Sequence, residues 1–164
     1  MIMGTMHDGG ECMMRCGDNA LTEAIATAAR RVFVNLFTKK ETYYYCALAT
    51  TKDGHAPIVV ACSWEGLMGT AIRPGNEELS MPELQWAIHE SPYFNYGQEH
   101  FADVNRMFAE RPSKDKLTPE AWGLELGIRL QSMEDALARL EREGLFARTQ
   151  QHGLIHVLVD VIQR

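Results

Sequence analysis

Residues 83–101, ELQWAIHESPYFNYGQEHF, gather side chains that can stack on a ligand, donate hydrogen bonds or move protons. Those that would line a ligand pocket or an enzyme site are Trp86, His89, Tyr93, Tyr96 and His100. His89 and Glu90 do not form a catalytic pair merely by being adjacent, because neighbouring side chains point apart on a helix or a strand. A pocket near residues 86–100 is one hypothesis for this stretch.

The same stretch also suits a packed turn. Ser91-Pro92 would end one helix, and Gly97 would allow a bend before the next. Buried aromatic side chains supply much of the stability of a small core, and those available here are Trp86, Tyr93 and Phe94. We therefore interpret most of the stretch as packing, with a polar edge that could serve as a site.

Acidic side chains form the second set of candidates. The chain has 16 Lys and Arg against 22 Asp and Glu, a net charge of -6. Such a surface repels nucleic acid and anionic lipid and suits a basic protein partner. The candidate contacts with that partner are Glu77, Glu78, Glu90 and Glu99, the first two in a Gly- and Pro-rich loop over residues 66–80.

Residues with metal or redox chemistry form no established motif. His7, Cys12 and Cys16 make the only metal-like cluster, which has fewer and more widely spaced ligands than a structural zinc site. Cys46 and Cys62 are expected to be small buried hydrophobes with free thiols. The sequence lacks a nucleophile elbow, a Gly-rich phosphate loop, HExxH and paired CxxC. We therefore predict no catalytic residue, metal or cofactor.

Apolar periodicity indicates the helices that would position these residues. A helix should run from Asp18 or Asn19 to about Phe37, and another over residues 101–110. A third should begin after Thr118, whose side chain can cap it, and end at Gly144. The capping-box pattern SMED at 132–135 leaves open a break within this third helix.

Residues 42–66 predict a β-hairpin around Asp53-Gly54. If the hairpin is centred on Gly54, the opposed pairs are Tyr44 with Trp64, Cys46 with Cys62, Leu48 with Val60, and Thr50 with Ile58. Both faces carry small or apolar residues, so the hairpin should be central in its sheet. Strict alternation over residues 154–161 predicts a further, half-buried strand.

These elements predict an α+β fold. The expected domain spans residues 19–164, with a small, mostly antiparallel sheet of the hairpin and C-terminal strand packed against about four helices. Residues 1–18 lack a structural period and are predicted to be a flexible leader. No stretch reaches the roughly 18 apolar residues of a membrane helix, and the N-terminus lacks signal-peptide features, so we expect a cytoplasmic protein with no membrane partner.

Residues 133–161 resemble the helix and wing of a winged-helix DNA-binding protein. The helix carries more acids than bases: Glu134, Asp135, Glu141 and Glu143 against Arg139 and Arg142. Such a surface is unfavourable beside phosphates, so we predict no nucleic-acid partner.

Several segments carry a resemblance to a known family. They are FVNLF, YYYCALATT and its hairpin turn, LQWAIHESPYFNYGQEHFADVNRMF, and ALARLEREGLF followed by an apolar strand. Over about residues 20–162 the chain resembles the bacterial family catalogued as domain of unknown function 4303. The positions that match its pattern, and that the resemblance implies to be a structural signature, are Trp86, Pro92, Tyr93, Gly97 and Phe101.

The resemblance implies a small cytoplasmic bacterial protein of a family with unassigned activity, some members of which are encoded near contact-dependent or secreted toxins. Our leading hypothesis is therefore a binding module, an immunity protein that neutralises a cognate toxin by occluding it. The alternative is a small-ligand-binding protein or an enzyme that uses the pocket near residues 86–100. A third hypothesis, a domain of a larger complex, requires a large exposed apolar patch.

Overall fold

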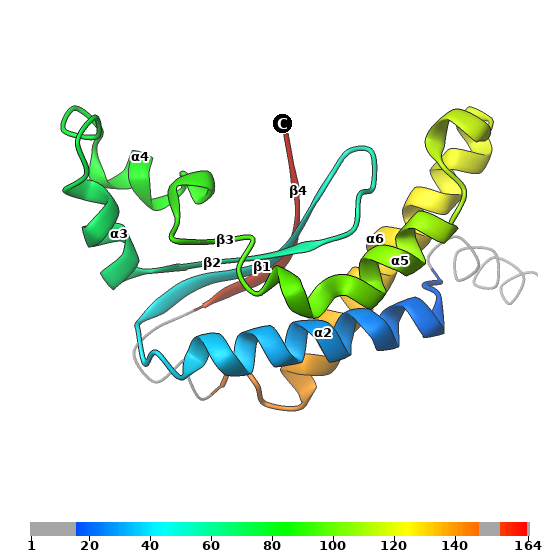
Figure 1. The fold of residues 1–164 in the computed structure, drawn as a ribbon, viewed down its shortest axis with the longest axis horizontal. Helices are drawn as coiled ribbons and strands as arrows, with labels where there is room; N and C mark the ends of the chain where they lie inside the picture. Colours follow the sequence, from blue (N-terminus) through cyan, green and yellow to red (C-terminus); the bar gives the residue numbers. More distant parts are fainter. Residues whose placement is uncertain (1–15, 148–154, 164) are drawn as a thin grey trace, which may run out of the picture.

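The computed structural model describes residues 16–147 and 155–163 (Figure 1). The predicted leader therefore lies almost wholly outside the described residues, as do His7 and Cys12. The elements in chain order are α2 (Asn19–Phe37), β1 (Tyr43–Thr51), β2 (Ile58–Ser63), α3 (Trp64–Ala71), α4 (Met81–Gln85), η1 (Ile88–Glu90), β3 (Tyr93–Phe94), η2 (Gln98–Phe101), α5 (Ala102–Glu110), η3 (Lys114–Lys116), α6 (Pro119–Arg142) and β4 (His156–Ile162).

The strands form one mixed sheet in the order β3-β2-β1-β4. β1 pairs antiparallel with β2, and β2 pairs antiparallel with the short β3. β4 pairs with β1 in parallel, from Tyr45 opposite His156 to Thr51 opposite Ile162. The predicted α+β fold is confirmed, with the hairpin central and the C-terminal strand beside it.

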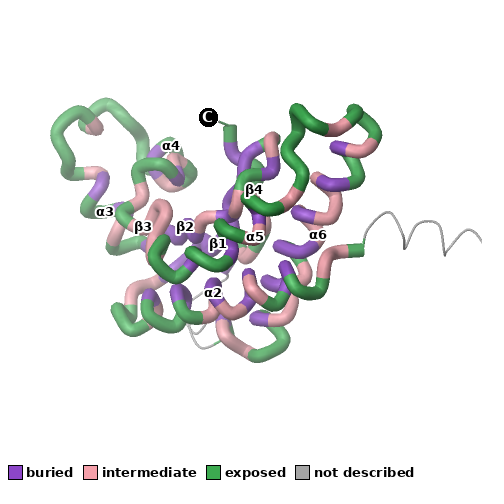
Figure 2. Tube along the Cα trace, turned by 45° about the vertical axis from the view of Figure 1, so that its right-hand side comes forward, coloured by how far each residue is buried: buried purple, intermediate pink, exposed green. Residues whose placement is uncertain are grey.

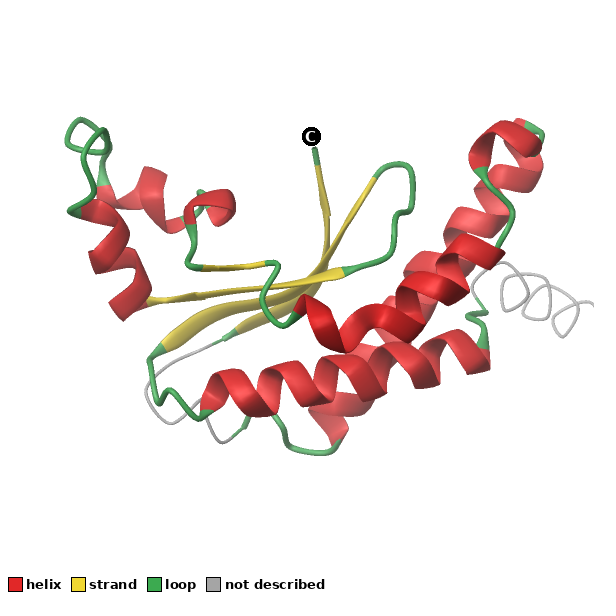
Figure 3. Cartoon of the chain, in the orientation of Figure 1, coloured by secondary structure: helices red, strands yellow, loops and turns green. Residues whose placement is uncertain are grey.

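Three helices, α2, α5 and α6, cover one face of the sheet (Figure 3). The Asp18 side chain caps α2 by accepting the Leu21 N–H at 2.8 Å, and the Thr118 side chain caps α6 by accepting the Ala121 N–H. α6 continues without a break through residues 132–135. There the Ser132 hydroxyl donates to the Ile128 carbonyl and accepts the Asp18 N–H, so it ties α6 to the start of α2.

The predicted pairing across the hairpin is wrong by one residue. Cys46 lies opposite Ala61, and Cys62 lies opposite Tyr45, so the two cysteines are not a cross-strand pair. The observed pairs are centred between Asp53 and Gly54 rather than on Gly54. Such a one-residue shift in pairing moves the side chains of a strand to the opposite face of the sheet. Cys46 consequently packs in the helix-covered core, whereas Cys62 packs on the other face of the sheet.

A bulge at Tyr44 adjusts the start of β1. The register shifts between Tyr43 and Tyr45, so that Tyr43 faces the helix layer while Tyr44 and Tyr45 both join the cluster on the opposite face. That cluster is completed by Ala47, Ala49, Val60, Cys62, Ile88 and Ile162. Tyr45 donates a hydrogen bond of 2.6 Å to Asp160, which anchors β4 to β1 on this face.

The predicted loop over residues 66–80 is wrong in its first half, because α3 begins directly where β2 ends. The Ser63 hydroxyl accepts the Gly66 N–H at 2.9 Å, and this cap starts the helix despite Gly66 and Gly69. α4 has a complete capping box between Ser80 and Glu83. In the part of the chain that is described, no helix has the length and apolarity required to cross a membrane.

Candidate functional site

α3 and α4 lie beside the end of the sheet, away from the α2, α5 and α6 layer, and most of their surface is exposed (Figure 2). Six of the ten exposed large apolar side chains among the described residues occur here: Trp64, Met68, Ile72, Leu79, Met81 and Trp86. We call these six residues the α3–α4 surface. Isolated exposed apolar residues are ordinary, but their concentration within a short part of the chain is typical of a binding surface.

The outward face of α3 supplies half of the α3–α4 surface. Trp64, Met68 and Ile72 are spaced by four residues and therefore share one side of the helix. Leu67 and Thr70 are the buried residues of α3 and fix its inward side. The sequence prediction missed this stripe because Trp64 was assigned to the hairpin and residues 66–80 to a loop, although the spacing from Trp64 to Ile72 was a visible helical signal.

Tyr44 joins α3, α4 and the sheet beneath the α3–α4 surface. Its ring centroid lies 4.7 Å from that of Trp64 and 5.9 Å from that of Trp86. Its hydroxyl donates to the Gln85 carbonyl at 2.9 Å. Trp86 also contacts the ring of His156 at the start of β4, with 5.8 Å between centroids. Both exposed indoles are therefore held by neighbouring rings.

Hydrogen bonds also hold the segment between α3 and α4. The Asn76 side chain donates to the Thr70 carbonyl at 3.0 Å, and Glu77 accepts the Gly75 N–H at 2.8 Å. Glu83 accepts the Ser80 N–H, which lowers the pKa of the Glu83 carboxyl below its ordinary value. This segment thus has several internal restraints although most of it is exposed.

Glu65 fixes the start of α3 to the start of β1. Its two carboxylate oxygens accept the Thr42 N–H at 2.8 Å and the Thr42 hydroxyl at 2.9 Å. Partial burial raises the pKa of Glu65, but these hydrogen bonds outweigh it, so the pKa lies below its ordinary value. Glu65 therefore remains ionised at neutral pH beside Trp64.

The net negative charge of the protein arises in the segment over residues 54–105, where Lys and Arg are sparse. Residues 54–105 contain seven acids, Glu65, Glu77, Glu78, Glu83, Glu90, Glu99 and Asp103, and a single Lys or Arg, Arg73. The remainder of the sequence has 15 acids and 15 bases, so this segment accounts for the whole net charge of -6. The α3–α4 surface is therefore apolar with an acidic surround, a pattern that a charge count along the sequence reveals.

Three of the four predicted partner contacts, Glu77, Glu78 and Glu90, are exposed residues between α3 and β3. Glu99 is also exposed, but it lies on η2, which packs against α2 and α5 rather than α3. The close approach of η2 to α2 depends on Gly97. A Cβ there would come within 2.7 Å of a Val32 methyl carbon, and the positive φ of 69° favours glycine.

The residues of the predicted pocket are distributed over different contacts. Trp86 belongs to the α3–α4 surface, and the His89 ring lies 4.9 Å from that of Phe94. Tyr93 donates to the Glu41 carboxylate, and Tyr96 donates to Asn35 at 2.8 Å. His100 lies 3.7 Å from Glu99. Three cavities among the described residues, beside Arg129, beneath α3 at Cys62 and beside Ile162, are lined by residues other than these five.

Metal-binding chemistry finds no support in the described part of the chain, where no three His, Cys, Asp or Glu side chains are grouped to hold an ion. Burial raises the pKa of the Cys46 and Cys62 thiols, which opposes thiolate formation at either residue.

The fold and this surface define a small α+β protein in which six of the ten exposed large apolar side chains of the described residues lie in the net-acidic segment 54–105. The chain belongs to the family described as Domain of unknown function (DUF4303), whose model matches residues 21–163. Neither a curated protein nor a solved structure matches the chain.

Proposed function

We propose that this protein is a binding module that engages a basic protein partner through the α3–α4 surface. In this proposal it acts in the cytoplasm as an immunity protein and neutralises a toxin by occluding it. The observation that carries the proposal is the concentration of exposed apolar side chains within residues 54–105, the segment that carries the net negative charge.

The two properties of the surface would serve different parts of the binding reaction. Burial of Trp64, Met68 and Trp86 would supply affinity, and tryptophan is the residue most enriched among energetically dominant contacts. The surrounding carboxylates would steer a basic partner and accelerate encounter. Because Tyr44 already holds both indoles, binding would immobilise few additional side chains.

We take a toxin as the class of partner from the expectation that some proteins of the resembling family are encoded near toxins. An immunity protein must capture its toxin before the toxin acts, and electrostatic steering meets that requirement when the toxin is basic. Toxins that act on nucleic acids have basic binding surfaces, which an acidic protein can cover. Occlusion requires no catalytic residue in the immunity protein, and this agrees with the scattered arrangement of His89, Tyr93 and His100.

The test begins with the tagged protein purified from its native organism after mild crosslinking, with the bound proteins identified by mass spectrometry. The effector encoded beside it is then produced, and binding and neutralisation are measured with purified components. We expect a one-to-one complex that protects a susceptible strain. If the neighbouring effector neither binds nor is neutralised, the immunity function is wrong.

A matched pair of variants tests the assigned surface. Met68 on α3 and Leu124 on α6 are each 58 % exposed. Met68→Arg should weaken the complex about tenfold or more. The arginine removes an apolar contact and places a positive charge against a partner that is itself basic. Leu124→Arg should leave the affinity unchanged. Equal effects of the two substitutions would place the interface elsewhere on the protein.

A further inference from the structure

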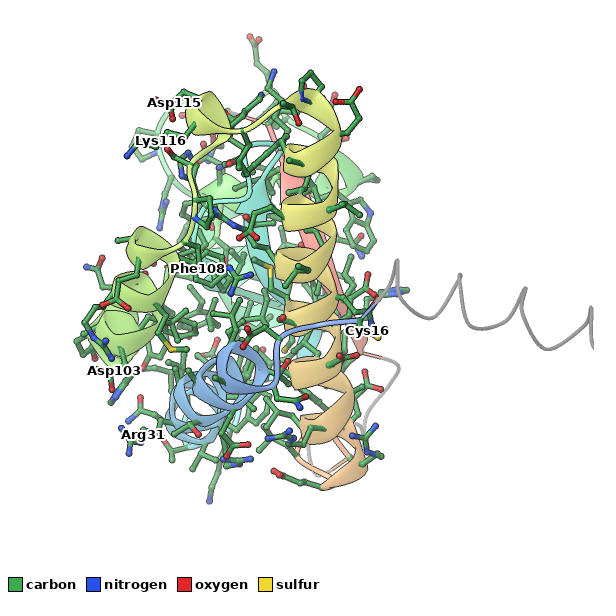
Figure 4. The ribbon with its side chains drawn as sticks, turned by 90° about the vertical axis from the view of Figure 1, so that its right-hand side faces the viewer. Cys16, Arg31, Asp103, Phe108, Asp115 and Lys116 are labelled. Atoms are coloured by element: carbon green, nitrogen blue, oxygen red, sulfur yellow. The ribbon has the colours of Figure 1, made fainter. Side chains whose placement is uncertain are left out.

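A cavity of about 1000 Å³ opens at the other end of the molecule from α3 and α4. Its walls are the hairpin connection around Asp53 and His55, the C-terminal part of α5, the 111–118 connection and α6. Figure 4 looks onto this end, with Asp115 and Lys116 at the outer part of the 111–118 connection and Phe108 beside α6. The volume is in the range of small-molecule sites.

The cavity has an apolar side formed by Phe108, Leu117 and Trp122. The rings of Phe108 and Trp122 also pack against the Arg129 guanidinium. The guanidinium carbon lies 5.2 Å from the Trp122 ring centroid and 5.5 Å from that of Phe108. A ligand in the cavity would therefore meet flat apolar surface and a fixed cation together.

Arg129 is buried and held in place from several directions. It donates to Glu125 at 2.9 Å, to the Gly54 carbonyl at 3.0 Å and to the Pro112 carbonyl at 2.8 Å. These bonds use three of the five N–H groups of a guanidinium, and the other two have no partner among the described residues. Arg129 is thus preorganised and retains donors.

Arg111 is the second guanidinium that lines the cavity. It forms a two-point contact with Glu125, at 2.6 and 3.1 Å, and a longer one with Asp18 at 3.3 Å. Glu125 and Asp18 are not among the described residues that line the cavity. The carboxylates that pair with the two arginines therefore do not form part of the cavity wall.

The lining has the opposite sign to the protein. Its charged members are Arg111, Lys114 and Arg129 against Asp53 and Asp115, a net charge of +1 in a chain of net charge -6. Lys114 pairs with Asp53 at 2.9 Å across the two loops, and both side chains are exposed. Exposed pairs of this kind are weak, so Lys114 can exchange Asp53 for an anionic group on a ligand.

From this arrangement we infer that the cavity is a binding site for a small organic anion, a carboxylate or phosphate ester that carries a flat apolar group. The anionic group is bound by Lys114 and the free donors of Arg111 and Arg129. The flat group packs against Phe108, Leu117 and Trp122. The site is separate from the α3–α4 surface and does not depend on the proposed partner.

The test uses four probes: phenyl phosphate, benzoate, inorganic phosphate and benzyl alcohol. Titrations of the full chain are followed by amide NMR shifts. We expect phenyl phosphate or benzoate to bind with the largest shifts around residues 105–117 and 53–56, and to bind at least about fivefold more tightly than benzyl alcohol or inorganic phosphate. Any of three results would overturn the inference. They are an affinity for benzyl alcohol equal to that for the aromatic anions, chemical shift changes that map elsewhere in the chain, and no binding of either aromatic anion.

Lys114→Gln and Lys39→Gln provide the matched comparison. Both lysines are exposed, but only Lys114 lines the cavity. The affinity for the aromatic anion should fall about five- to tenfold in Lys114→Gln, through loss of a charge-assisted contact, and should be unchanged in Lys39→Gln. The same loss in both variants, or in neither, contradicts the assignment. Met68→Arg should bind the aromatic anion with wild-type affinity. Failure of the proposed anion site can therefore be distinguished from failure of the proposed partner surface.

Discussion

Arg129 connects parts of the chain that are distant in sequence. Its hydrogen bonds join α6 to the hairpin connection at Gly54 and to the connection after α5 at Pro112. Through Glu125 it is also linked to Arg111 and the start of α2. Since only 6 % of Arg129 is exposed, this network is a buried structural element as well as one side of the cavity.

Replacing Arg129 should be strongly destabilising. Arg129→Met keeps much of the side-chain volume, but it removes one of the two arginines that bind Glu125 and takes the Arg129 donors away from the Gly54 and Pro112 carbonyls. We therefore expect a loss of about 3 kcal/mol in the free energy of unfolding. Urea denaturation followed by circular dichroism measures this loss. Arg106→Met on α5 is the control, because Arg106 forms only exposed ion pairs with Asp103 and Glu110 and should change stability little. Similar stabilities of the two variants would contradict the importance of the buried network.

Glu125 predicts a pH dependence of stability. Burial raises the pKa of Glu125, but hydrogen bonds and charge attraction from Arg111 and Arg129 outweigh it and hold the pKa below the ordinary 4.5. A pKa lowered by folding means that the stabilisation is complete above the ordinary pKa and is lost as the pH falls through the folded value. Urea unfolding between about pH 3 and 7 should therefore show a shallower acid-side decline in Glu125→Gln than in the wild type. An unchanged slope would exclude this linkage.

At the scale of elements, two close contacts to the helix layer depend on glycine. Gly54 lies at the hairpin connection with φ of 65°, and a Cβ there would approach Leu126 of α6 within 2.9 Å. Gly97 holds η2 against Val32 of α2 in the same manner. Each position brings a connection against the helix layer where a side chain would collide, and Gly97 is one of the residues by which the chain resembles its family.

Gly97→Ala should lower the free energy of unfolding by about 1–3 kcal/mol, because it combines an unfavourable φ with a collision against Val32. Gly123→Ala on α6 is the matched control. A Cβ at Gly123 has nothing within 4 Å, so alanine should stabilise the helix by about 0.5–1 kcal/mol. Thermal and urea unfolding of both variants measure the difference. If Gly123→Ala is destabilised and Gly97→Ala keeps the wild-type free energy of unfolding, the prediction is wrong.

Across the whole molecule, the two candidate sites differ in charge and position. The α3–α4 surface lies within residues 54–105, which carry the net charge of -6, whereas the cavity between the hairpin connection and the 111–118 connection has a net positive lining. One chain can therefore present a protein-binding surface at one end and a small anion site at the other.

Association with a basic partner should depend on salt through its rate. Raising the ionic strength from about 50 to 500 mM should lower the association rate constant about tenfold or more and change the dissociation rate constant little. Stopped-flow measurements should also show slower association for the double substitution Glu77→Lys, Glu78→Lys. Glu134→Lys on α6 is the control and should have a smaller effect. A salt-independent association rate would contradict electrostatic steering.

Local sequence patterns determined most of the elements. The apolar spacing and the caps at Asp18 and Thr118 specify α2 and α6, because helix formation depends on neighbours within a few residues. Alternation specifies the hairpin strands and β4 for the same reason. The exposure of Glu77, Glu78 and Glu90 also follows from their local setting.

Tertiary structure alone decided the register, the direction of β4 and the arrangement of the sites. The bulge at Tyr44 and the shift that separates Cys46 from Cys62 depend on which residues pack against the helix layer. The parallel pairing of β4 joins residues more than a hundred positions apart, and the hydrogen bond from Arg129 beside the cavity to the Gly54 carbonyl spans 75 positions. A local pattern contains no information on such distant contacts, because their geometry is set when the elements pack together.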